Sequence, residues 1–235
     1  MVSRKTILLI LFFSITFSIE VFVNVKEVFD FKKEFFNYSL KEDLLEINLF
    51  INNIGSLGFF SSLKLEINNK SIWSEEKELY PGSSKHFQVY YLFDEPGNYS
   101  IKAKLYAGDE IFYLYNFSIE LKNIKEKNNT FEVKWIRVKD KFVEIKLKSK
   151  ENTKAIVSIE DYPQTWKFEQ KIIELLKDKW TKVRVNYEAL YFEKNLTLKI
   201  FDVYSENLFY EIFNFKKESK LKGILLDFFE LIGIY

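Results

Sequence analysis

An internal repeat constrains the fold of this chain more than any other feature. Segments with strand-like patterning in residues 43–113 recur in the same order about 95 residues later. The matches pair 43–49 with 141–147, 63–66 with 157–160, Trp73 with Trp166, 78–79 with 174–175, 87–89 with 183–185, 98–102 with 195–199 and 108–113 with 205–210. One match would mean little, whereas an ordered series indicates the duplication of one unit.

Each copy is patterned as short strands. Leu45, Ile47, Leu49 and Ile51 alternate with other residues, which is the period-2 pattern of a strand with one buried face. Turn signals separate such runs at 52–55, 68–69, 81–82 and 96–98. This spacing predicts a sandwich of two antiparallel sheets in each copy. Residues 171–179 also fit a helical turn, but the repeat assigns them to a strand and the turn after it.

The turns of the first copy have a recognisable form. Asn-Asn-Ile-Gly-Ser at 52–56, Leu-Tyr-Pro-Gly-Ser-Ser at 79–84 and Pro-Gly-Asn-Tyr-Ser-Ile at 96–101 mark successive corners. Residues 40–112 thereby resemble the CARDB-type (cell-adhesion-related) immunoglobulin-like module of prokaryotic, typically archaeal, cell-surface proteins. The second copy has Lys177-Asp178 and Glu193-Lys194 in place of the two Pro-Gly turns, so its membership depends on the repeat. The resemblance implies a β-sandwich used in adhesion or assembly, without catalytic residues.

The N-terminus has the layout of a secretory signal peptide. Arg4 and Lys5 precede an apolar run, and Thr16 and Ser18 are small residues at the expected cleavage positions. An uncleaved anchor is the alternative, although the run stops at Glu20 and is short for a span of about 20 residues.

These patterns predict an all-β chain of two tandem immunoglobulin-like antiparallel β-sandwiches with a short C-terminal amphipathic helix. The expected divisions are a signal peptide at 1–18, a first sandwich at 19–122, a linker at 123–130, a second sandwich at 131–216 and the helix at 217–235.

Glycosylation sequons support export. Six Asn-x-Ser/Thr triplets occur, where chance gives roughly two. The candidate asparagines are Asn37, Asn69, Asn98, Asn116, Asn128 and Asn195.

Composition excludes several chemistries. The net charge of +1 argues against nucleic acid as the main partner, and the absence of Cys excludes disulfides and thiol catalysis. His86 is the sole histidine, and it is expected to face solvent on a strand. The acidic pairs at 94–95 and 109–110 could supply calcium oxygens, but solvated loop charge is the favoured interpretation. We therefore expect no catalytic residue, metal or cofactor.

Aromatic residues make up 18% of the chain, and two strands are rich in them. Residues 111–117 and 208–215 are apolar on both faces, so a second covering surface is expected. Packing between the domains or against the C-terminal segment is favoured over docking of a partner. The partner-contact candidates on these strands are Phe112, Leu114, Phe209 and Phe213.

The C-terminal segment follows helical spacing. Its apolar residues, also partner-contact candidates, are Leu221, Ile224, Leu225, Phe228, Phe229 and Ile232. Three roles stay open: docking on the chain's own sheet, insertion into a partner groove, and peripheral contact with a membrane.

The sequence thus predicts a non-catalytic, secreted or cell-surface structural or adhesion protein. Its partner would be an envelope protein or glycan, bound through apolar strand faces and the terminal helix. Two alternatives remain: a carbohydrate-binding module using Trp135, Trp166 or Tyr113, and an accessory subunit of a membrane-bound complex.

Overall fold

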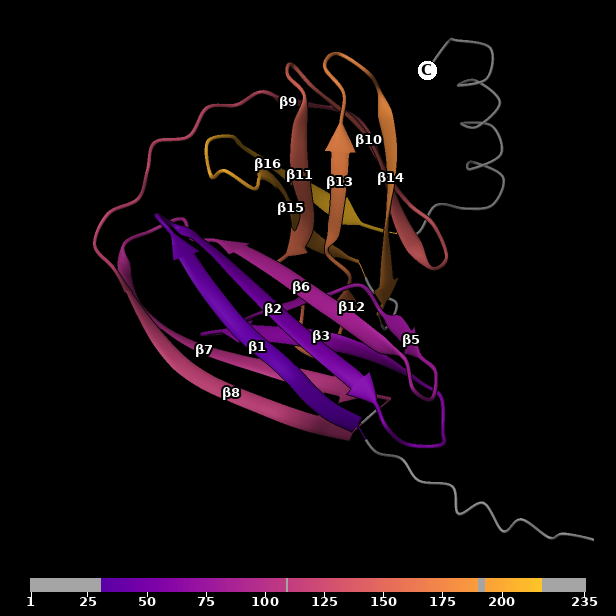
Figure 1. Ribbon diagram of the computed structural model, residues 1–235. Coiled ribbons are helices and arrows are strands. Elements are labelled where there is room, and N and C mark those ends of the chain that lie inside the picture. The colour runs from indigo at the N-terminus through magenta and orange to yellow at the C-terminus, as the bar shows by residue number, and fades with distance from the viewer. Residues whose placement is uncertain (1–30, 109, 190–192, 217–235) are drawn as a thin grey trace, which may run out of the picture.

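The computed structural model describes residues 31–108, 110–189 and 193–216, and these residues form strands but no helix (Figure 1). The strands are β1 (Phe31–Lys41), β2 (Leu44–Asn53), β3 (Phe59–Ile67), β4 (Lys70–Trp73), β5 (Lys77–Leu79), β6 (Ser84–Leu92), β7 (Gly97–Ala107), β8 (Glu110–Leu121), β9 (Phe131–Val138), β10 (Phe142–Ser149), β11 (Thr153–Glu160), β12 (Lys167–Phe168), β13 (Lys171–Leu175), β14 (Thr181–Glu188), β15 (Lys194–Asp202) and β16 (Leu208–Phe215). The predicted all-β class is confirmed for this part of the chain. The predicted signal peptide and C-terminal helix lie outside the described residues.

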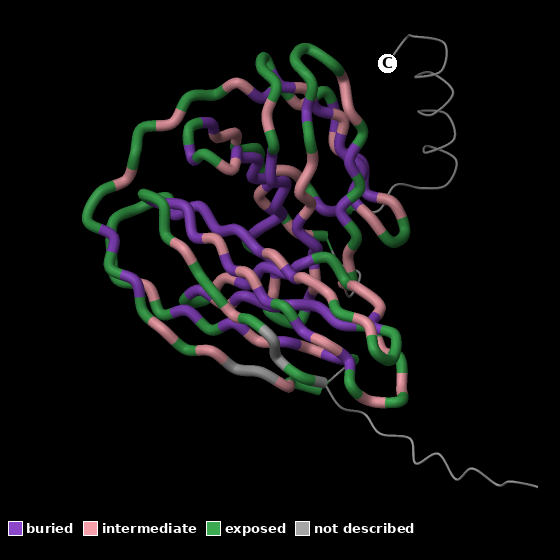
Figure 2. The backbone as a smooth tube through the Cα atoms, viewed as in Figure 1, coloured by how far each residue is buried: buried purple, intermediate pink, exposed green. Residues whose placement is uncertain are grey.

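Strands β1 to β8 form two antiparallel sheets, which we call the N-terminal sheet pair. One sheet has the order β1-β2-β6, and the other has the order β4-β3-β7-β8 with β5 also on β3. The alternating residues of β2, including Leu45 and Ile47, are fully buried between the sheets, as their period-2 pattern requires. Figure 2 shows this alternation of buried and exposed positions along the strands.

Strands β9 to β16 repeat the arrangement as the C-terminal sheet pair. Here the sheets have the orders β12-β14-β10-β9 and β13-β11-β15-β16. Their core contains Val143, Ile145 and Trp166, all almost inaccessible to solvent. The ambiguous segment 171–179 begins with β13, so the choice of strand over helix is confirmed.

The register of the two copies differs by two residues on one strand pair. Ile47 pairs with Val89 on β6, whereas Ile145 pairs with Val183 on β14. The sequence repeat had aligned Val89 with Val185 instead. Because side chains alternate with a period of two, this slip keeps each residue on the same face, and it is invisible to a pattern-based alignment.

The second copy keeps a turn whose Pro-Gly sequence it has lost. Gly82 has φ 72°, and its N–H donates to the Asn53 carbonyl at 2.7 Å. At the matching position Asp178 has φ 57°, and its N–H donates to the Ser149 carbonyl at 2.7 Å. The left-handed backbone is therefore a property of the repeated unit, and the second copy adopts it without glycine.

This turn gives a direct test of the repeat. We expect Asp178→Gly to raise the free energy of unfolding by about 0.5–1 kcal/mol, because glycine adopts the left-handed conformation without the Cβ penalty. Gly82→Asp should lower it by a similar amount, since a Cβ at Gly82 meets no atom within 4 Å and only the backbone cost applies. Urea unfolding of both variants measures this, and destabilisation by Asp178→Gly would contradict it.

Asn53 joins two of the turns that carried the family resemblance. This fully buried side chain donates to the carbonyls of Leu57 at 2.7 Å and Leu79 at 3.1 Å. Its Oδ1 accepts a hydrogen bond from the Gly55 N–H at 3.0 Å. The Asn-x-Gly and Leu-x-Pro-Gly turns are thus parts of one hydrogen-bonded corner, which explains why they occur together.

Two aromatic stacks close the side of the N-terminal sheet pair where β1 and β8 form the edges. The Phe36 and Tyr115 rings stack at 3.7 Å between centroids, and the Tyr38 and Phe117 rings stack at 4.2 Å. The covering surface expected for β8 therefore includes β1 of the same sheet pair, whereas packing between the domains or against the C-terminal segment was favoured. The separation of β1 and β8 along the chain hid this contact from the sequence.

Candidate functional site

The candidate site is the seam where the two sheet pairs meet, and Gln170 is its central polar contact. The buried Gln170 side chain accepts from the Tyr90 N–H at 2.8 Å and donates to the Tyr90 carbonyl at 2.8 Å. Its backbone N–H donates to the Trp73 carbonyl at 2.8 Å. Tyr90 is on β6 and Trp73 ends β4, so one residue fastens the exposed edges of both N-terminal sheets.

An apolar cluster lies beside Gln170. Leu44, Tyr90 and Leu92 from the N-terminal sheet pair pack with Ile156 and Phe201 from the C-terminal pair, and all five are buried. Burial of this surface favours one fixed arrangement of the sheet pairs over independent movement.

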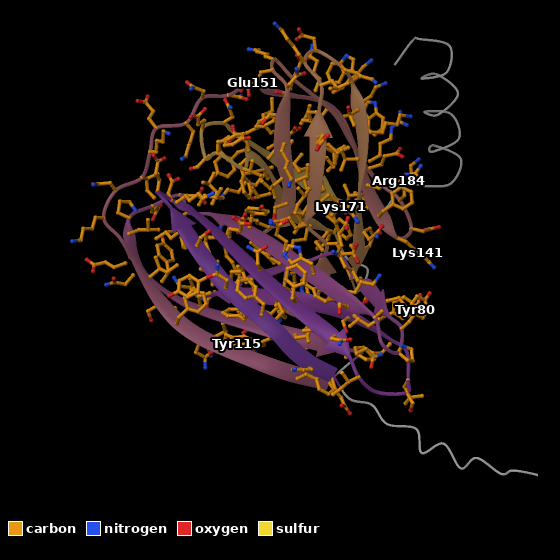
Figure 3. The ribbon with its side chains drawn as sticks, viewed as in Figure 1. Tyr80, Tyr115, Lys141, Glu151, Lys171 and Arg184 are labelled. Carbon is orange, nitrogen blue, oxygen red and sulfur yellow. The ribbon has the colours of Figure 1, made fainter. Side chains whose placement is uncertain are left out.

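Lysine side chains add ion pairs along the seam. Lys171 donates to Glu75 Oε1 at 2.7 Å, and Lys167 donates to Glu76 Oε2 at 2.7 Å. Lys171 is labelled in Figure 3, where it extends from β13 between the two sheet pairs. These pairs are partly solvated and contribute modestly, whereas two further clusters are centred on the buried side chains of Lys199 and Asp43.

The first buried cluster surrounds Lys199. This side chain is completely inaccessible, and its Nζ donates to the Leu92 carbonyl at 2.6 Å and to Asp94 Oδ1 and Oδ2 at 2.8 and 2.9 Å. The Tyr210 hydroxyl donates to Asp94 Oδ1. Burial and the adjacent Asp94 carboxylate raise the pKa of Tyr210, so the phenol stays protonated and acts as a donor.

Glu160 extends this cluster toward the N-terminal sheet pair. Its Oε2 accepts from Lys70 Nζ at 3.1 Å, and its Oε1 lies 3.8 Å from Lys199 Nζ. Burial opposes the charged form of Lys70, but the Glu160 and Asp161 carboxylates outweigh it and raise the pKa of the Lys70 ammonium.

The second buried cluster surrounds Asp43, which follows the end of β1. Lys127 Nζ donates to Asp43 Oδ1 at 2.7 Å and to the Ser205 carbonyl at 2.6 Å, and the Lys125 N–H donates to Asp43 Oδ2 at 3.0 Å. The Ser205 hydroxyl also donates to Asp43. Burial acts to raise the pKa of Asp43, but these hydrogen bonds and the Lys127 charge hold it below its usual value.

Open clefts flank the seam. One, of about 330 Å³, is lined by residues that include Lys70, Tyr91 and Asp94. Another, of about 470 Å³, is lined by residues that include Glu46, Tyr90 and Tyr204. Both border these clusters, so solvent reaches the edges of the seam, whereas Gln170 at its centre is buried.

All six sequon asparagines are exposed: Asn37, Asn69, Asn98, Asn116, Asn128 and Asn195. Their positions leave space for a sugar, although Asn69 lines the 330 Å³ cleft at the seam. Whether any of them is modified stays a prediction.

The partner-contact candidates are not brought together on one free surface. Phe209 and Phe213 pack against the core of the C-terminal sheet pair, and Phe112 is half-buried. The side chain of Leu114 lies outside the described residues, as do Leu221, Ile224, Leu225, Phe228, Phe229 and Ile232. The exposed apolar side chains of this sheet pair include Ile212 and Leu176 instead.

The aromatic residues suggested for sugar binding are mostly internal. Trp135 is 6% exposed and Trp166 is 1% exposed, so the expectation that they lie at the surface is wrong. The side chain of Tyr113 lies outside the described residues. A large aromatic side chain is equally suited to a buried core and to stacking on a sugar at the surface, so the sequence did not distinguish these two roles.

His86 and the acidic pairs have other roles than those expected. His86 is half-buried, contacts Asn48 Oδ1 through Nε2 at 2.7 Å and stacks on Phe50. Burial and the nearby Lys77 charge lower the pKa of His86. Asp94 pairs with Lys199, while Asp109 lies outside the described residues. Among the described residues, no three acidic or histidine side chains gather as metal ligands.

Sequence reasoning missed Gln170, Lys199 and Asp43. Each is a single polar residue beside a strand-like run, and its partner is about 80 to 160 residues away. One signal was present: Lys199 lies between Leu198 and Ile200, next to a run of apolar residues.

Comparisons with known proteins assign no family. No protein-family model matches the chain, and no curated protein matches it. Solved structures that are similar in part include a β-glucosidase from Kluyveromyces marxianus (16% identity, TM-score 0.28, 40% of this chain and 14% of that one). Others are red sea bream transglutaminase (10%, 0.28, 79% and 31%) and a β-glycosidase from Bacteroides vulgatus (13%, 0.24, 71% and 22%). The chain spans less than a third of each, and such scores assign no activity. No helix within the described residues is long and apolar enough to cross a membrane.

Proposed function

We propose that this chain is a non-catalytic structural or adhesion protein of a prokaryotic, archaeal-type cell envelope, held outside the membrane. Its two sheet pairs would be tandem immunoglobulin-like domains. The strand order supports this assignment, because β1-β2-β6 facing β5-β3-β7-β8 recurs as β9-β10-β14 facing β13-β11-β15-β16. The copies differ in one short strand, since β4 pairs with β3 whereas β12 pairs with β14.

The seam is the observation that carries the proposal. Buried polar residues such as Gln170, Lys199 and Asp43 are used to join the two sheet pairs, and their partners come from the other pair or from the segment between them. Domains in one chain ordinarily move relative to each other unless their interface is large and apolar. A protein that holds two sandwiches in one orientation is suited to bear load or to present surfaces at a fixed spacing.

The contact surface in this proposal differs from the one expected from sequence. Phe35 and Phe50 are cross-strand partners on the outer face of β1 and β2, and their side chains are 49% and 37% exposed. They support binding of an envelope component better than Phe209 and Phe213, which are already packed. The same two rings are also what a carbohydrate-binding role would have to use.

Peptide mapping of the protein from fractionated native cells tests the location. We expect it in the envelope fraction, with an N-terminus at Ile19 and sugar mass on several of the six sequon asparagines. A cytoplasmic protein with an intact Met1 and bare asparagines would contradict the proposal.

Binding to isolated envelopes tests the contact surface. The double variant Phe35→Ser and Phe50→Ser should lose at least ten-fold in affinity, while Tyr80→Ser, which removes a similarly exposed ring at another corner, should bind as the wild type does. Deletion of residues 217–235, measured in parallel, gives the contribution of the terminal segment to envelope binding. Equal binding by the double variant and the wild type would exclude this face.

A further inference from the structure

We propose that Lys199 and Asp94 condense to form an intramolecular isopeptide bond that covalently joins the two sheet pairs, with Glu160 transferring the protons. This cross-link goes beyond the proposed function and does not depend on where the protein is located. Three features of the Lys199 cluster support it: the position of the amine, a buried carboxylate oxygen without a hydrogen-bond partner among the described residues, and aromatic rings around the amine.

The amine and the carboxyl group already face each other. Lys199 Nζ is within 2.8 and 2.9 Å of the two Asp94 oxygens, so it lies opposite the carboxyl carbon to which it would bond. The Leu92 carbonyl accepts from the same Nζ at 2.6 Å and fixes the end of this long side chain. Such positioning replaces a bimolecular encounter with a reaction between groups held in place.

Glu160 supplies a proton acceptor. Its Oε2 is held by Lys70, whereas its Oε1 is buried, has no hydrogen-bond partner among the described residues and lies 3.8 Å from Lys199 Nζ. A buried carboxylate oxygen without a partner is costly, and it is uncommon in folded proteins. Its position next to the amine gives it a use as the base that takes up an ammonium proton.

Aromatic rings surround the fully buried Lys199 amine, whereas solvent reaches the Asp94 carboxylate. The ring centroids of Tyr91, Tyr210 and Phe201 lie 5.3, 5.4 and 6.0 Å from Lys199 Nζ. The Tyr210 hydroxyl donates to Asp94 Oδ1, where it would stabilise the negative charge that forms on that oxygen. Asp94 also lines the 330 Å³ cleft, which offers a path for the water that is released.

The reaction balances without a co-reactant. Glu160 takes one proton from the Lys199 ammonium and passes it to Asp94, which gives a neutral amine and a neutral carboxylic acid. The amine nitrogen bonds to Asp94 Cγ, the Cγ–Oδ2 bond breaks, and Oδ2 leaves as water with a second ammonium proton that Glu160 has transferred. The third proton stays on the amide nitrogen, so an ammonium and a carboxylate become an amide and one water.

A cross-link here would serve the role that disulfides serve in many exported proteins. The chain contains no Cys, and the two residues are 105 positions apart. A covalent bond over such a distance restricts the unfolded chain strongly. It would join the loop after β6 to strand β15, that is, one sheet pair to the other.

The chain provides its own control. Lys127 and Asp43 form a second buried ion pair at 2.7 Å. There Ser205 and backbone groups supply the remaining hydrogen bonds, and within the described part of the chain no carboxylate other than that of Asp43 contacts Lys127 Nζ. The Lys127–Asp43 pair thus resembles the Lys199–Asp94 pair in its ion-pair distance but has no neighbouring carboxylate to transfer protons. We therefore expect Lys127 and Asp43 not to condense.

Intact-mass measurement of the purified full chain tests the proposal. We expect a mass about 18 Da below that of the sequence, from the loss of one water. Tryptic mapping should recover the Asp94 and Lys199 peptides as one branched species with no cleavage after Lys199, while cleavage after Lys127 proceeds normally. A full sequence mass with free Asp94 and Lys199 peptides would overturn the inference and leave an ordinary ion pair.

Glu160→Gln separates the chemistry from the fold. Glutamine keeps the shape and a polar end but does not accept the proton, so this variant should remain at its full mass while retaining the wild-type circular dichroism spectrum. Asp94→Ala should also keep its full mass, because the carboxyl carbon is gone. Condensation in Glu160→Gln at the wild-type extent would overturn the role given to Glu160.

Discussion

Replacement of Gln170 by Ala is expected to lower the free energy of unfolding by about 4 kcal/mol. The variant leaves the N–H and the carbonyl of Tyr90 buried without their partner, and each unsatisfied buried group costs about 1–3 kcal/mol. The backbone bond to Trp73 does not depend on the side chain, so the segment can still approach the seam.

The form of the unfolding transition should change as well. The wild type is expected to unfold in one cooperative step, because the seam couples the sheet pairs, whereas Gln170→Ala should show two steps by differential scanning calorimetry. Gln88→Ala is the matched control, since Gln88 is half-buried on the outer face and bonds Glu46 and Tyr90 side chains within one sheet pair. If Gln170→Ala lowered the free energy of unfolding no more than Gln88→Ala does, the seam would not be what holds the sheet pairs together.

Asp43→Ala is expected to lower the free energy of unfolding by about 3–5 kcal/mol, because it leaves the buried Lys127 ammonium without its countercharge. It also removes the acceptor of the Lys125 N–H, which positions the segment between the two sheet pairs. Urea unfolding measures the loss. Glu42→Gln is the control: Glu42 precedes Asp43 and forms an exposed ion pair with Lys125, so its loss should cost less than about 1 kcal/mol.

The same residue sets a pH dependence. The pKa of Asp43 is lowered in the folded state, so its stabilisation is present above the unfolded value near 3.8 and is lost as the pH falls through the folded value. The unfolding free energy of the wild type should therefore decrease below about pH 4 more steeply than that of Asp43→Ala. Parallel acid dependences for the two proteins would contradict this assignment.

The strands could be predicted from sequence because their signal is local. Leu45 to Ile51 alternate along one strand, and the repeat carried the same pattern through the ambiguous segment at 171–175. The seam could not be predicted, because Gln170 and Tyr90 are far apart in the chain and neither belongs to a motif. The burial of Trp166 could not be predicted either, because a tryptophan in a strand-rich sequence can lie in the core or at a sugar-binding surface.

The contact of Gln170 with the edges of β4 and β6 has a consequence for the history of the chain. Unpaired strand edges are templates for aggregation, and here the second copy of a duplicated unit shields two edges of the first. The two copies therefore have different structural roles and are not interchangeable. Removal of the second copy is therefore expected to expose the edges of β4 and β6 and to make the first copy prone to aggregate.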